Sequence, residues 1–308
     1  MKKIGVLYGR ENTFPGALVA KINELGAGNF EAESLSIGAI TMEQLYDYRV
    51  IIDRISQDVP FYRAVLKHAV MQGVNVINNP FWWTADDKFF NYALAHKIGV
   101  AIPKTALLPH KQHPPDINSQ SLRNLLYPLN FDEIFEYIGF PAFLKPYSGG
   151  GWKHVYKVHS REEFFSAYDQ TGDLCMTLQS NVEFTDYFRC YVIGKKNIHI
   201  MRYDPRLPHE RRYVLDGPPL DPAMHDRLTS DCLKICNALG YDMNTVEFAV
   251  QDGIPYAIDF LNPAPDADYH SVGPENFAWI VNAMAELAIE EAGKKVSKPK
   301  DYRWSKFL

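Results

Sequence analysis

The feature that most constrains the fold of this chain is an alternation of short apolar runs with helical segments near its N-terminus. The runs Ile4–Tyr8, Val50–Ile52 and Val74–Ile77 are short and almost wholly apolar, as buried strands are. Two segments with helical spacing, Phe14–Leu25 and Pro60–Met71, lie between these runs. Strands that alternate with helices form right-handed crossovers and a parallel sheet. The sequence therefore predicts a parallel α/β domain at the N-terminus.

The remainder of the chain predicts a mixture of strands and helices. Residues 109–130 are polar and contain several prolines, which favours a surface loop. A strand is expected at Pro141–Lys145, strands dominate from Leu174 onward, and a long helix is expected from Phe277 to Ala292. The fold class is therefore α/β, with α+β parts after the N-terminal domain.

Composition and charge limit the partners and the compartment. The formal net charge is −5, so no basic field attracts the chain to nucleic acid. No segment approaches the roughly 18 consecutive apolar residues of a membrane helix, and the N-terminus lacks the apolar core of a signal peptide. The four cysteines lack the spacing of a metal site and are expected to be buried thiols. We therefore expect a cytoplasmic protein with neither nucleic acid nor a membrane as its partner.

Two lysines and a run of glycines could bind phosphate. Lys88 lies in the first turn of an expected helix, and Lys145 ends a strand just before the run Ser148–Gly151. A lysine meets phosphate oxygens as a point charge, and successive glycine N–H groups can hold anionic oxygens. Taken alone, each feature is explained more simply by a surface lysine or a flexible turn.

Two acidic residues lie in strands that a hairpin would join. Glu247 and Asp259 flank the turn residues Asp252 and Gly253. A two-residue turn sends the two carboxylates to opposite faces, whereas a three-residue loop puts both on one face. We expect the three-residue loop, with Asn262 within reach. Such oxygen ligands suit Mg²⁺ bound together with ATP phosphates, although the alternative is a polar hairpin face that meets solvent.

Taken in order, these features resemble the ATP-grasp superfamily over nearly the whole chain. Segments 47–80 and 86–105 are most similar to the ligases that add glutamate to a peptide terminus, and D-alanine–D-alanine ligase is a more distant relative by the same pattern. The resemblance implies an ATP-grasp fold in which two α+β lobes clamp Mg-ATP. It implies an N-terminal parallel-sheet domain at 1–106, a central lobe with a glycine-rich lid at 107–182, and a C-terminal lobe with the metal-binding hairpin at 183–308.

The resemblance also implies roles for individual residues. Lys88 and Lys145 would contact the α- and β-phosphates, and the lid would close over the triphosphate. The residues expected at the nucleotide are Ser148, Gly149, Gly150 and Gly151 in the lid, Gln179, Ser180, Asn181 and Val182 at the adenine, and Glu183 at the ribose.

The remaining implied roles concern the reacting groups. Arg189 and Arg202 would approach the γ-phosphate and the developing acyl phosphate. Glu247, Asp259 and Asn262 would hold one or two Mg²⁺ ions. Asp259 and Asn262 are three residues apart where the superfamily usually has two, and a bulge near Leu261 would restore the geometry.

Two further departures from the superfamily pattern affect the hinge and the lid. The resemblance makes Gln179–Val182 the hinge between the lobes, and Ser180 stands where this hinge usually carries a glutamate. The lid continues into the bulky sequence Trp152-Lys153-His154.

Two segments could contact the substrates. An arginine-rich segment could bind an anionic acid, or it could be a solvated basic loop; its residues are Arg202, Arg206, His209, Arg211 and Arg212. The segment Asn262–His270 follows the expected metal ligands directly. Its acids could bind an amine and His270 could take the amine's proton, or the segment could merely cap the last helix.

The sequence thus predicts an ATP-dependent carboxylate–amine ligase that works through an acyl phosphate and releases ADP and phosphate. The expected partners are a small-molecule or peptide carboxylate and an amine, with a homodimer as an open possibility. Two alternatives remain at this point: a kinase that phosphorylates a hydroxyl, and a nucleotide-binding protein without turnover.

Overall fold

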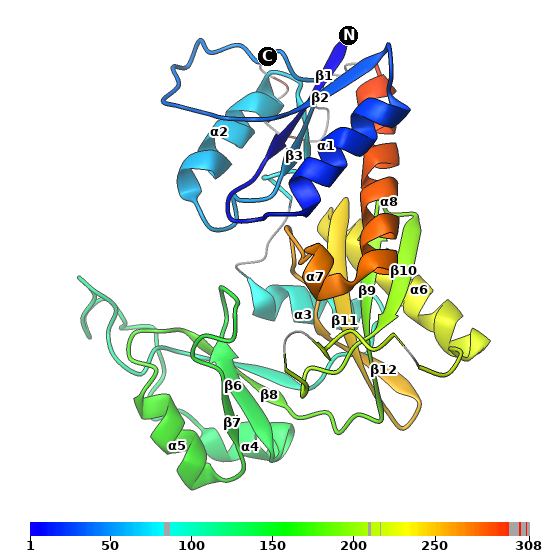
Figure 1. Cartoon of the computed structure of the whole chain (residues 1–308). Helices are drawn as coiled ribbons and strands as arrows, with labels where there is room; N and C mark the ends of the chain where they lie inside the picture. Colours follow the sequence, from blue (N-terminus) through cyan, green and yellow to red (C-terminus); the bar gives the residue numbers. More distant parts are fainter. Residues whose placement is uncertain (83–86, 209–210, 216, 296–301, 303–305, 307–308) are drawn as a thin grey trace. The chain divides into compact units, whose positions relative to one another are not determined.

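The fold is described by a computed structural model of the chain. It covers all 308 residues except 83–86, 209–210, 216, 296–301, 303–305 and 307–308. The chain forms two compact units (Figure 1). Unit 1 comprises Met1–Trp83, Asp186–Phe248 and Asp259–Leu308, and unit 2 comprises Thr84–Thr185 and Ala249–Ile258.

Unit 1 begins with the predicted parallel sheet. Its strands are β1 (Lys2–Leu7), β2 (Phe30–Ser34), β3 (Val50–Asp53) and β4 (Asn75–Ile77), in the order β2-β1-β3-β4. All neighbouring pairs run parallel. Helices α1 (Phe14–Leu25) and α2 (Pro60–Met71) have the bounds that the sequence predicts. The sheet is therefore the expected α/β domain, with β2 as an additional edge strand.

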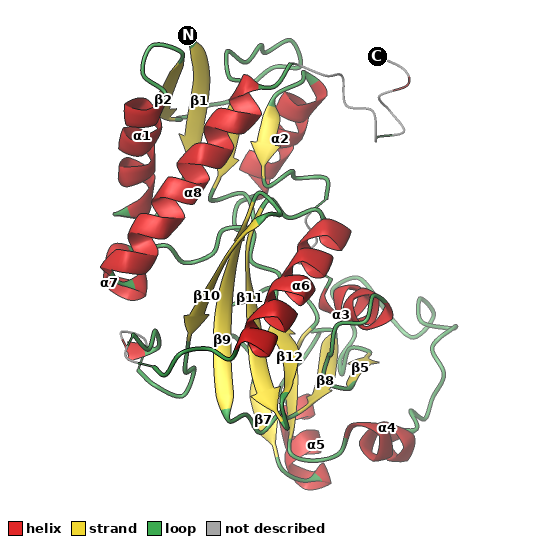
Figure 2. Ribbon diagram, turned by 90° about the vertical axis from the view of Figure 1, so that its right-hand side faces the viewer, coloured by secondary structure: helices red, strands yellow, loops and turns green. Residues whose placement is uncertain are grey.

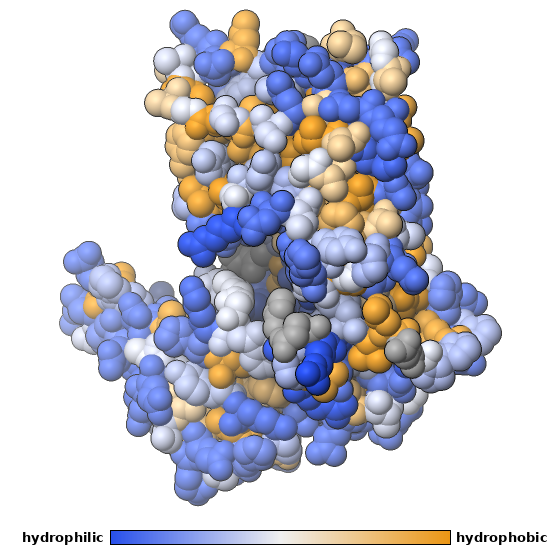
Figure 3. Space-filling model, in the orientation of Figure 1, coloured by the Kyte–Doolittle hydropathy of each residue, from blue (hydrophilic) through white to orange (hydrophobic). Residues whose placement is uncertain are grey.

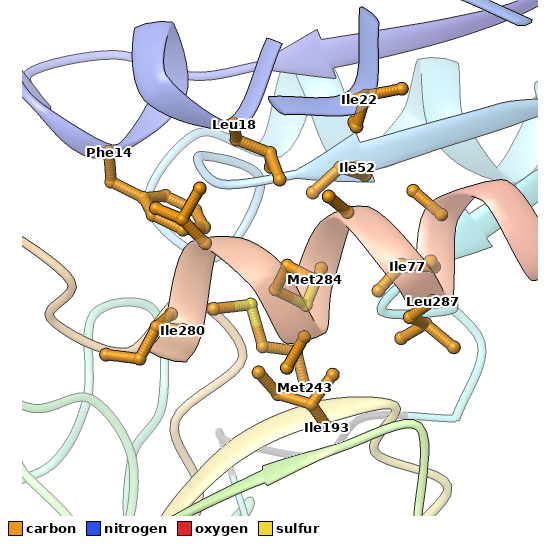
Figure 4. Packing of buried hydrophobic residues seen from close by; sticks show 14 of the residues in the cluster. Phe14, Leu18, Ile22, Ile52, Ile77, Ile193, Met243, Ile280, Met284 and Leu287 are labelled. Carbon is orange, nitrogen blue, oxygen red and sulfur yellow. The ribbon is translucent and has the colours of Figure 1, made fainter. Parts of the chain in front are cut away.

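Alternate residues of these strands bury against different helices. Ile52 belongs to the same apolar cluster as Leu18 of α1 and Met284 of the long helix α8 (Pro274–Gly293), as Figure 4 shows. Its neighbour Ile51 instead joins the cluster that contains Leu66 of α2. Successive residues of a strand face opposite sides of a sheet, so α1 and α8 cover one face and α2 covers the other (Figure 2).

The chain also contains an antiparallel sheet of four strands. Its strands are β9 (Asp186–Ile193), β10 (Asn197–Arg202), β11 (Met243–Gln251) and β12 (Ile254–Asp259), in the order β10-β9-β11-β12. Helix α6 (Pro222–Leu239) contacts β9, and Cys190 of β9 lies near enough to Cys232 of α6 to help raise the pKa of the Cys232 thiol, after burial. All four cysteines are free, and Cys190, Cys232 and Cys236 are buried, as the sequence predicts.

Two buried polar side chains tie the parallel sheet to the segment after β12. Arg54, which follows β3, forms a bidentate ion pair with Glu11 and donates to the carbonyl of Pro265 at 2.6 Å. Asn78, which follows β4, donates to the carbonyls of Met243 and Pro263 at 2.7 and 2.9 Å. Its side-chain oxygen accepts from two backbone N–H groups at the start of β11. Unit 1 is therefore joined by buried hydrogen bonds as well as by apolar packing.

Unit 2 contains a second antiparallel sheet covered by helices. Its strands are β5 (Thr105–Leu108), β6 (Ala142–Pro146), β7 (Tyr156–Val158) and β8 (Met176–Ser180), in the order β5-β8-β6-β7. Its helices are α3 (Lys88–Lys97), α4 (Phe131–Ile138) and α5 (Arg161–Asp169). Phe135 and Phe164 of the last two helices pack on Leu144 and Leu178 of the sheet. Residues 109–130 form turns and loops, as predicted.

None of the described helices, including the short α7 (Tyr269–Val272), is long and apolar enough to cross a membrane. Hydrophilic side chains are spread over the face of the molecule that Figure 3 shows.

Candidate active site

Lys145 is held by hydrogen bonds within unit 2. Its ammonium group donates to the hydroxyl of Tyr92 at 2.9 Å and to the side-chain oxygen of Gln179 at 2.8 Å. The amide nitrogen of Gln179 donates in turn to Thr105, which fixes the orientation of this amide. The ammonium also lies 5.0 Å from the centre of the Tyr92 ring. Lys145 is therefore a preorganised cation rather than a loose surface lysine.

Lys88 lies beside the glycine run. Lys88 is the first residue of helix α3. The preceding residue, Asp87, caps the helix, because its carboxylate accepts a hydrogen bond from the N–H of Phe90. The Lys88 ammonium donates to the carbonyls of Pro146 and Gly149, and its N–H donates to the carbonyl of Tyr147. The structure thus brings both predicted lysines to the two ends of the short segment 145–149.

The glycine run owes two of its glycines to backbone conformation. Gly149 and Gly151 have φ values of 78° and 73°, which a side chain rarely tolerates. A Cβ added at either of these positions or at Gly150 would meet nothing within 4 Å, so packing does not require glycine there. Trp152 and His154 also have positive φ, and the Trp152 side chain is 66% exposed. The conformation leaves Trp152 available to a ligand.

The predicted hinge uses several of its backbone groups internally. The N–H of Ser180 donates to Lys104 and the N–H of Asn181 donates to Pro141. The N–H of Glu183 donates to the side chain of Gln251 at the tip of the β11–β12 hairpin. The Val182 N–H is therefore the group of this segment that could meet an adenine edge.

A buried acid lies beside a buried arginine in unit 1. Glu247 on β11 and Arg189 on β9 have side chains only 15% and 12% exposed, and their Oε1 and Nε atoms are 3.5 Å apart. The Tyr187 hydroxyl donates to Oε2 of Glu247 at 2.6 Å, and Arg189 donates to the Tyr213 hydroxyl at 3.1 Å. The Arg189 guanidinium, which could bind phosphate, therefore lies beside the Glu247 carboxylate, which could bind a metal ion.

A second acid, Asp259, influences the charge of Glu247. Burial raises the pKa of the Glu247 carboxyl above its ordinary value, and the Asp259 carboxylate adds to the rise. The Arg189 guanidinium, the Tyr187 hydroxyl and the Arg212 guanidinium act in the opposite direction. Asp259 therefore lies close enough to Glu247 for the two negative charges to repel, which a cation between them would relieve.

The hairpin loop differs from the prediction. Strand β11 ends at Gln251 and β12 begins at Ile254, so the loop has two residues rather than three. Asp252 and Gly253 have φ values of 52° and 74°, as in the type I′ turn that Asp-Gly favours. A regular register after such a turn would put Glu247 and Asp259 on opposite faces. Asp259 is, however, the last residue of its strand, and its carboxylate still raises the pKa of Glu247. The repulsion between the two carboxylates therefore does not require that they share a face of the sheet.

Asn244, which the sequence analysis did not single out, holds the segment after β12. Its fully buried amide donates to the carbonyl of Phe260 at 2.8 Å and accepts from the N–H of Asn262 at 3.0 Å. The Asn262 amide nitrogen donates to the carbonyl of Thr245 at 3.1 Å. The oxygen of Asn262 is therefore the end of this amide that a metal ion could use. Among the described residues, no three His, Cys, Asp or Glu side chains cluster as a metal site, so an ion here would need ligands from elsewhere.

Arg202 does not join the Arg189–Glu247 pair. Arg202 lies directly opposite Phe188 in the β9–β10 register, and directly opposite residues share a face. Phe188 and Arg189 are consecutive, so the two arginines point to opposite faces of the sheet. Arg202 instead forms an ion pair with Asp186 at 2.9 Å and lines a cavity of about 240 Å³.

The other predicted substrate residues are dispersed. Arg206 forms a bidentate pair with Asp204 of its own loop, and His209 lies outside the described residues. Arg212 is near enough to Glu247 to lower the pKa of that acid. His270 lies exposed on α7, with its ring 5.4 Å from that of Tyr269.

Comparison with known sequences gives partial matches. No protein-family model matches the chain. Mitochondrial pyruvate carboxylase of Mus musculus is 29% identical over 133 residues, which cover 38% of this chain and 11% of that protein. D-alanine–D-alanine ligase of Clostridium botulinum is 24% identical over 195 residues, which cover 56% of this chain and 62% of that protein. The chain therefore matches less than two thirds of the length of either relative.

Solved structures match nearly the whole chain. D-alanine–D-alanine ligase from Bacillus anthracis, complexed with ATP, has a TM-score of 0.65 at 18% identity and covers 95% of this chain and 97% of its own. The RimK domain ATP-grasp protein from Sphaerobacter thermophilus has a TM-score of 0.66 at 14% identity, with coverages of 93% and 99%. The ATP-grasp ligase PsnB, complexed with a phosphomimetic precursor variant, Mg and ADP, has a TM-score of 0.62 at 13% identity, with coverages of 94% and 98%. The chain has the ATP-grasp fold, which confirms the predicted fold class.

Proposed function

We propose that the protein is an ATP-dependent carboxylate–amine ligase that forms a C–N bond through an acyl phosphate. The observation that carries the proposal is the group of Arg189, Glu247 and Asp259 within an ATP-grasp fold, in which the first two side chains are largely buried and Asp259 is exposed. A guanidinium beside two repelling carboxylates suits a phosphate that arrives with a divalent cation. The solved ATP complex of D-alanine–D-alanine ligase and the Mg and ADP complex of PsnB support ATP and Mg²⁺ as the ligands.

In this proposal unit 2 supplies the nucleotide-binding residues. Lys88 and Lys145 balance the charge of the α- and β-phosphates, because a preorganised ammonium needs little reorganisation to meet an anion. The lid residues Ser148–Gly151 offer backbone N–H groups to the triphosphate. The hinge Gln179–Val182 meets the adenine, mainly through the Val182 N–H, and Glu183 binds the ribose.

Unit 1 supplies the proposed metal ligands and a phosphate-binding cation. The carboxylates of Glu247 and Asp259 and the amide oxygen of Asn262 are hard oxygen donors, which Mg²⁺ prefers. They would hold one or two ions together with ligands supplied by the nucleotide. A bound Mg²⁺ would offset phosphate charge during the transfer. Arg189 meets the transferred phosphoryl group, whereas the position of Arg202 on the other face favours a role away from it.

The reaction proceeds in two balanced steps. A carboxylate oxygen of the acid attacks the γ-phosphorus, the bond from phosphorus to the bridging oxygen breaks, and ADP leaves. The amine then attacks the carbonyl carbon of the acyl phosphate, phosphate leaves, and the amine's proton passes to a base such as His270. The protein mainly positions the reactants and stabilises negative charge.

The substrates are a peptide or small-molecule carboxylate and an amine. The relatives include a pyruvate carboxylase and a D-alanine–D-alanine ligase, so the proposal does not extend to a particular pair of substrates. The free thiols favour a reducing compartment, for which we propose the cytoplasm.

Trapping with hydroxylamine tests the proposed intermediate. An acyl phosphate is a mixed anhydride, so hydroxylamine should intercept it without the natural amine. Candidate acids screened with Mg-ATP and hydroxylamine should yield, for the correct acid, a hydroxamate and ADP in equal amounts. A stable phosphomonoester as the sole product would refute the ligase and leave the fold unaffected.

A further inference from the structure

The shortest contact of the buried Glu247 carboxylate comes from a neutral residue. The Tyr187 hydroxyl donates to Glu247 Oε2 at 2.6 Å, whereas Nε of Arg189 lies 3.5 Å from Oε1. Arg189 Nε is buried and makes no hydrogen bond with any of the described residues. The orientation of Glu247 is therefore set by Tyr187 more than by the ion pair.

Tyr187 is a hydrogen-bond donor that packing holds in place. It is 8% exposed on the paired strand β9, and its ring packs beside that of Tyr203 at 5.9 Å. A phenol has an ordinary pKa of about 10 and is therefore protonated, and able to donate, at neutral pH. A phenol that stays protonated and cannot move away is suited to hold one carboxylate oxygen in place.

A neutral donor has an advantage over a cation at this place. A guanidinium on both oxygens of Glu247 would orient the acid but would also repel a metal ion. A hydroxyl on Oε2 orients the acid and adds no net charge, so the remaining lone pairs stay attractive to a cation. Outer-shell hydrogen bonds of this kind fix metal ligands, and their loss typically costs 10–100-fold in metal affinity.

We propose that Tyr187 is a positioning residue that orients Glu247 for the metal ion and so sets the strength of metal binding. This inference rests on the proposed function, because it requires Glu247 to be a metal ligand. It adds a residue from outside the predicted ligand set and assigns it a measurable effect.

The test compares ADP binding with and without metal. Calorimetry gives the dissociation constant of ADP in excess Mn²⁺ and in EDTA, and the ratio of the two is the metal-dependent gain. Tyr187→Phe should lower this gain about tenfold while leaving ADP affinity in EDTA unchanged. Tyr213→Phe, which removes a partly buried hydroxyl bonded to Arg189 rather than to Glu247, is the matched control and should retain the gain.

Two more variants separate the possible failures. Glu247→Gln should abolish the gain; if it does not, or if the wild type shows no gain, the proposed metal site is wrong and the role of Tyr187 falls with it. If Glu247→Gln abolishes the gain and Tyr187→Phe keeps it, the positioning role alone is refuted. Equal losses of ADP affinity with and without Mn²⁺ in Tyr187→Phe would show a purely structural effect. Tyr187→His, which keeps a ring N–H donor, should recover part of the gain and also tests the role if the phenylalanine variant does not fold.

Discussion

At the scale of single residues, the sequence indicates charged groups more readily than the groups that hold them. Lys145 and Glu247 stand out because a charge in an apolar strand needs a reason. Their partners Tyr92 and Tyr187 do not, because tyrosines are common in strands and cores. Which tyrosine reaches which charge depends on strand pairing and helix placement. These are long-range properties that local spacing does not contain.

Lys145→Ala should weaken ATP far more than adenosine. The lost contact is a charge-assisted one to phosphate, worth about 1.5–3 kcal/mol, so ATP affinity should fall roughly 10–150-fold. Adenosine, which lacks the phosphates, should bind almost as before in a calorimetric titration. Lys157→Ala, on the neighbouring strand β7, is the control, since that ammonium lies over the Phe143 ring. An equal loss for both ligands would remove Lys145 from the phosphate site.

At the scale of elements, agreement with the sequence follows the strength of the local pattern. Helices α1 and α2 match to the residue because apolar spacing, an initial proline and a following break all coincide. Strand β2 was missed because its sequence Phe-Glu-Ala-Glu-Ser carries two acids on an edge of the sheet. The prediction of the hairpin loop was wrong because it favoured the loop length that puts Glu247 and Asp259 on one face. The Asp-Gly pair itself favours the two-residue turn that is found.

The glycine run offers a test at this scale. Gly149→Ala or Gly151→Ala should raise the half-saturating ATP concentration, because alanine at positive φ costs about 1–2 kcal/mol, or roughly five- to thirtyfold. Gly150→Ala should behave as the wild type, since that residue has no positive φ and its Cβ would meet nothing nearby. Equal effects at all three positions in steady-state kinetics would contradict a conformational requirement confined to two glycines.

The same segment should respond to nucleotide. Amide hydrogen exchange of residues 148–154 should slow when Mg-ATP is added, because ligand contacts would satisfy groups that now face open space. Exchange of the buried strand β8 provides an internal reference in the same spectra. Unchanged exchange in the glycine segment at saturating Mg-ATP would argue against its role as a lid.

At the scale of the whole molecule, the ATP-grasp fold was predictable because many weak features occur in one order. A lysine, a glycine turn or an acidic hairpin is each ambiguous by itself, and their order along the chain is far more specific. The hydrogen bonds of Arg54 and Asn78 could not be predicted in this way. The bonds from these two residues to Met243, Pro263 and Pro265 join positions more than 160 apart in sequence, so no local pattern predicts them.

The stability of the molecule should depend on His199. This side chain stacks on Trp279 of α8, with ring centres 4.7 Å apart, and hydrogen-bonds to Asn276 at 2.6 Å. Burial lowers the pKa of His199 below its ordinary 6.5, although the Asn276 contact opposes this. The unfolded chain therefore takes up a proton first, and the stabilisation present above pH 6.5 is lost as the pH falls below it.

Urea unfolding at pH 7.5, 6.5 and 5.5 measures this loss. One histidine contributes a slope of at most about 1.4 kcal/mol per pH unit, which His199→Phe should remove from the wild-type profile. His225→Gln, at an exposed site on α6, should leave the profile unchanged. If His199→Phe and the wild type lose stability in parallel, another group is responsible.

The buried bonds from Arg54 and Asn78 bear on how such a chain can be recombined. They bind the N-terminal sheet to the stretch that follows the proposed metal ligands. A chimaera in which only the first 80 or so residues come from a relative would therefore separate these side-chain donors from the carbonyls that accept their hydrogen bonds. The residues that these hydrogen bonds join lie in distant parts of the sequence but must be exchanged together. They are Glu11, Arg54, Asn78, Met243, Pro263 and Pro265. Successful exchanges, in the laboratory or in evolution, should carry both parts together.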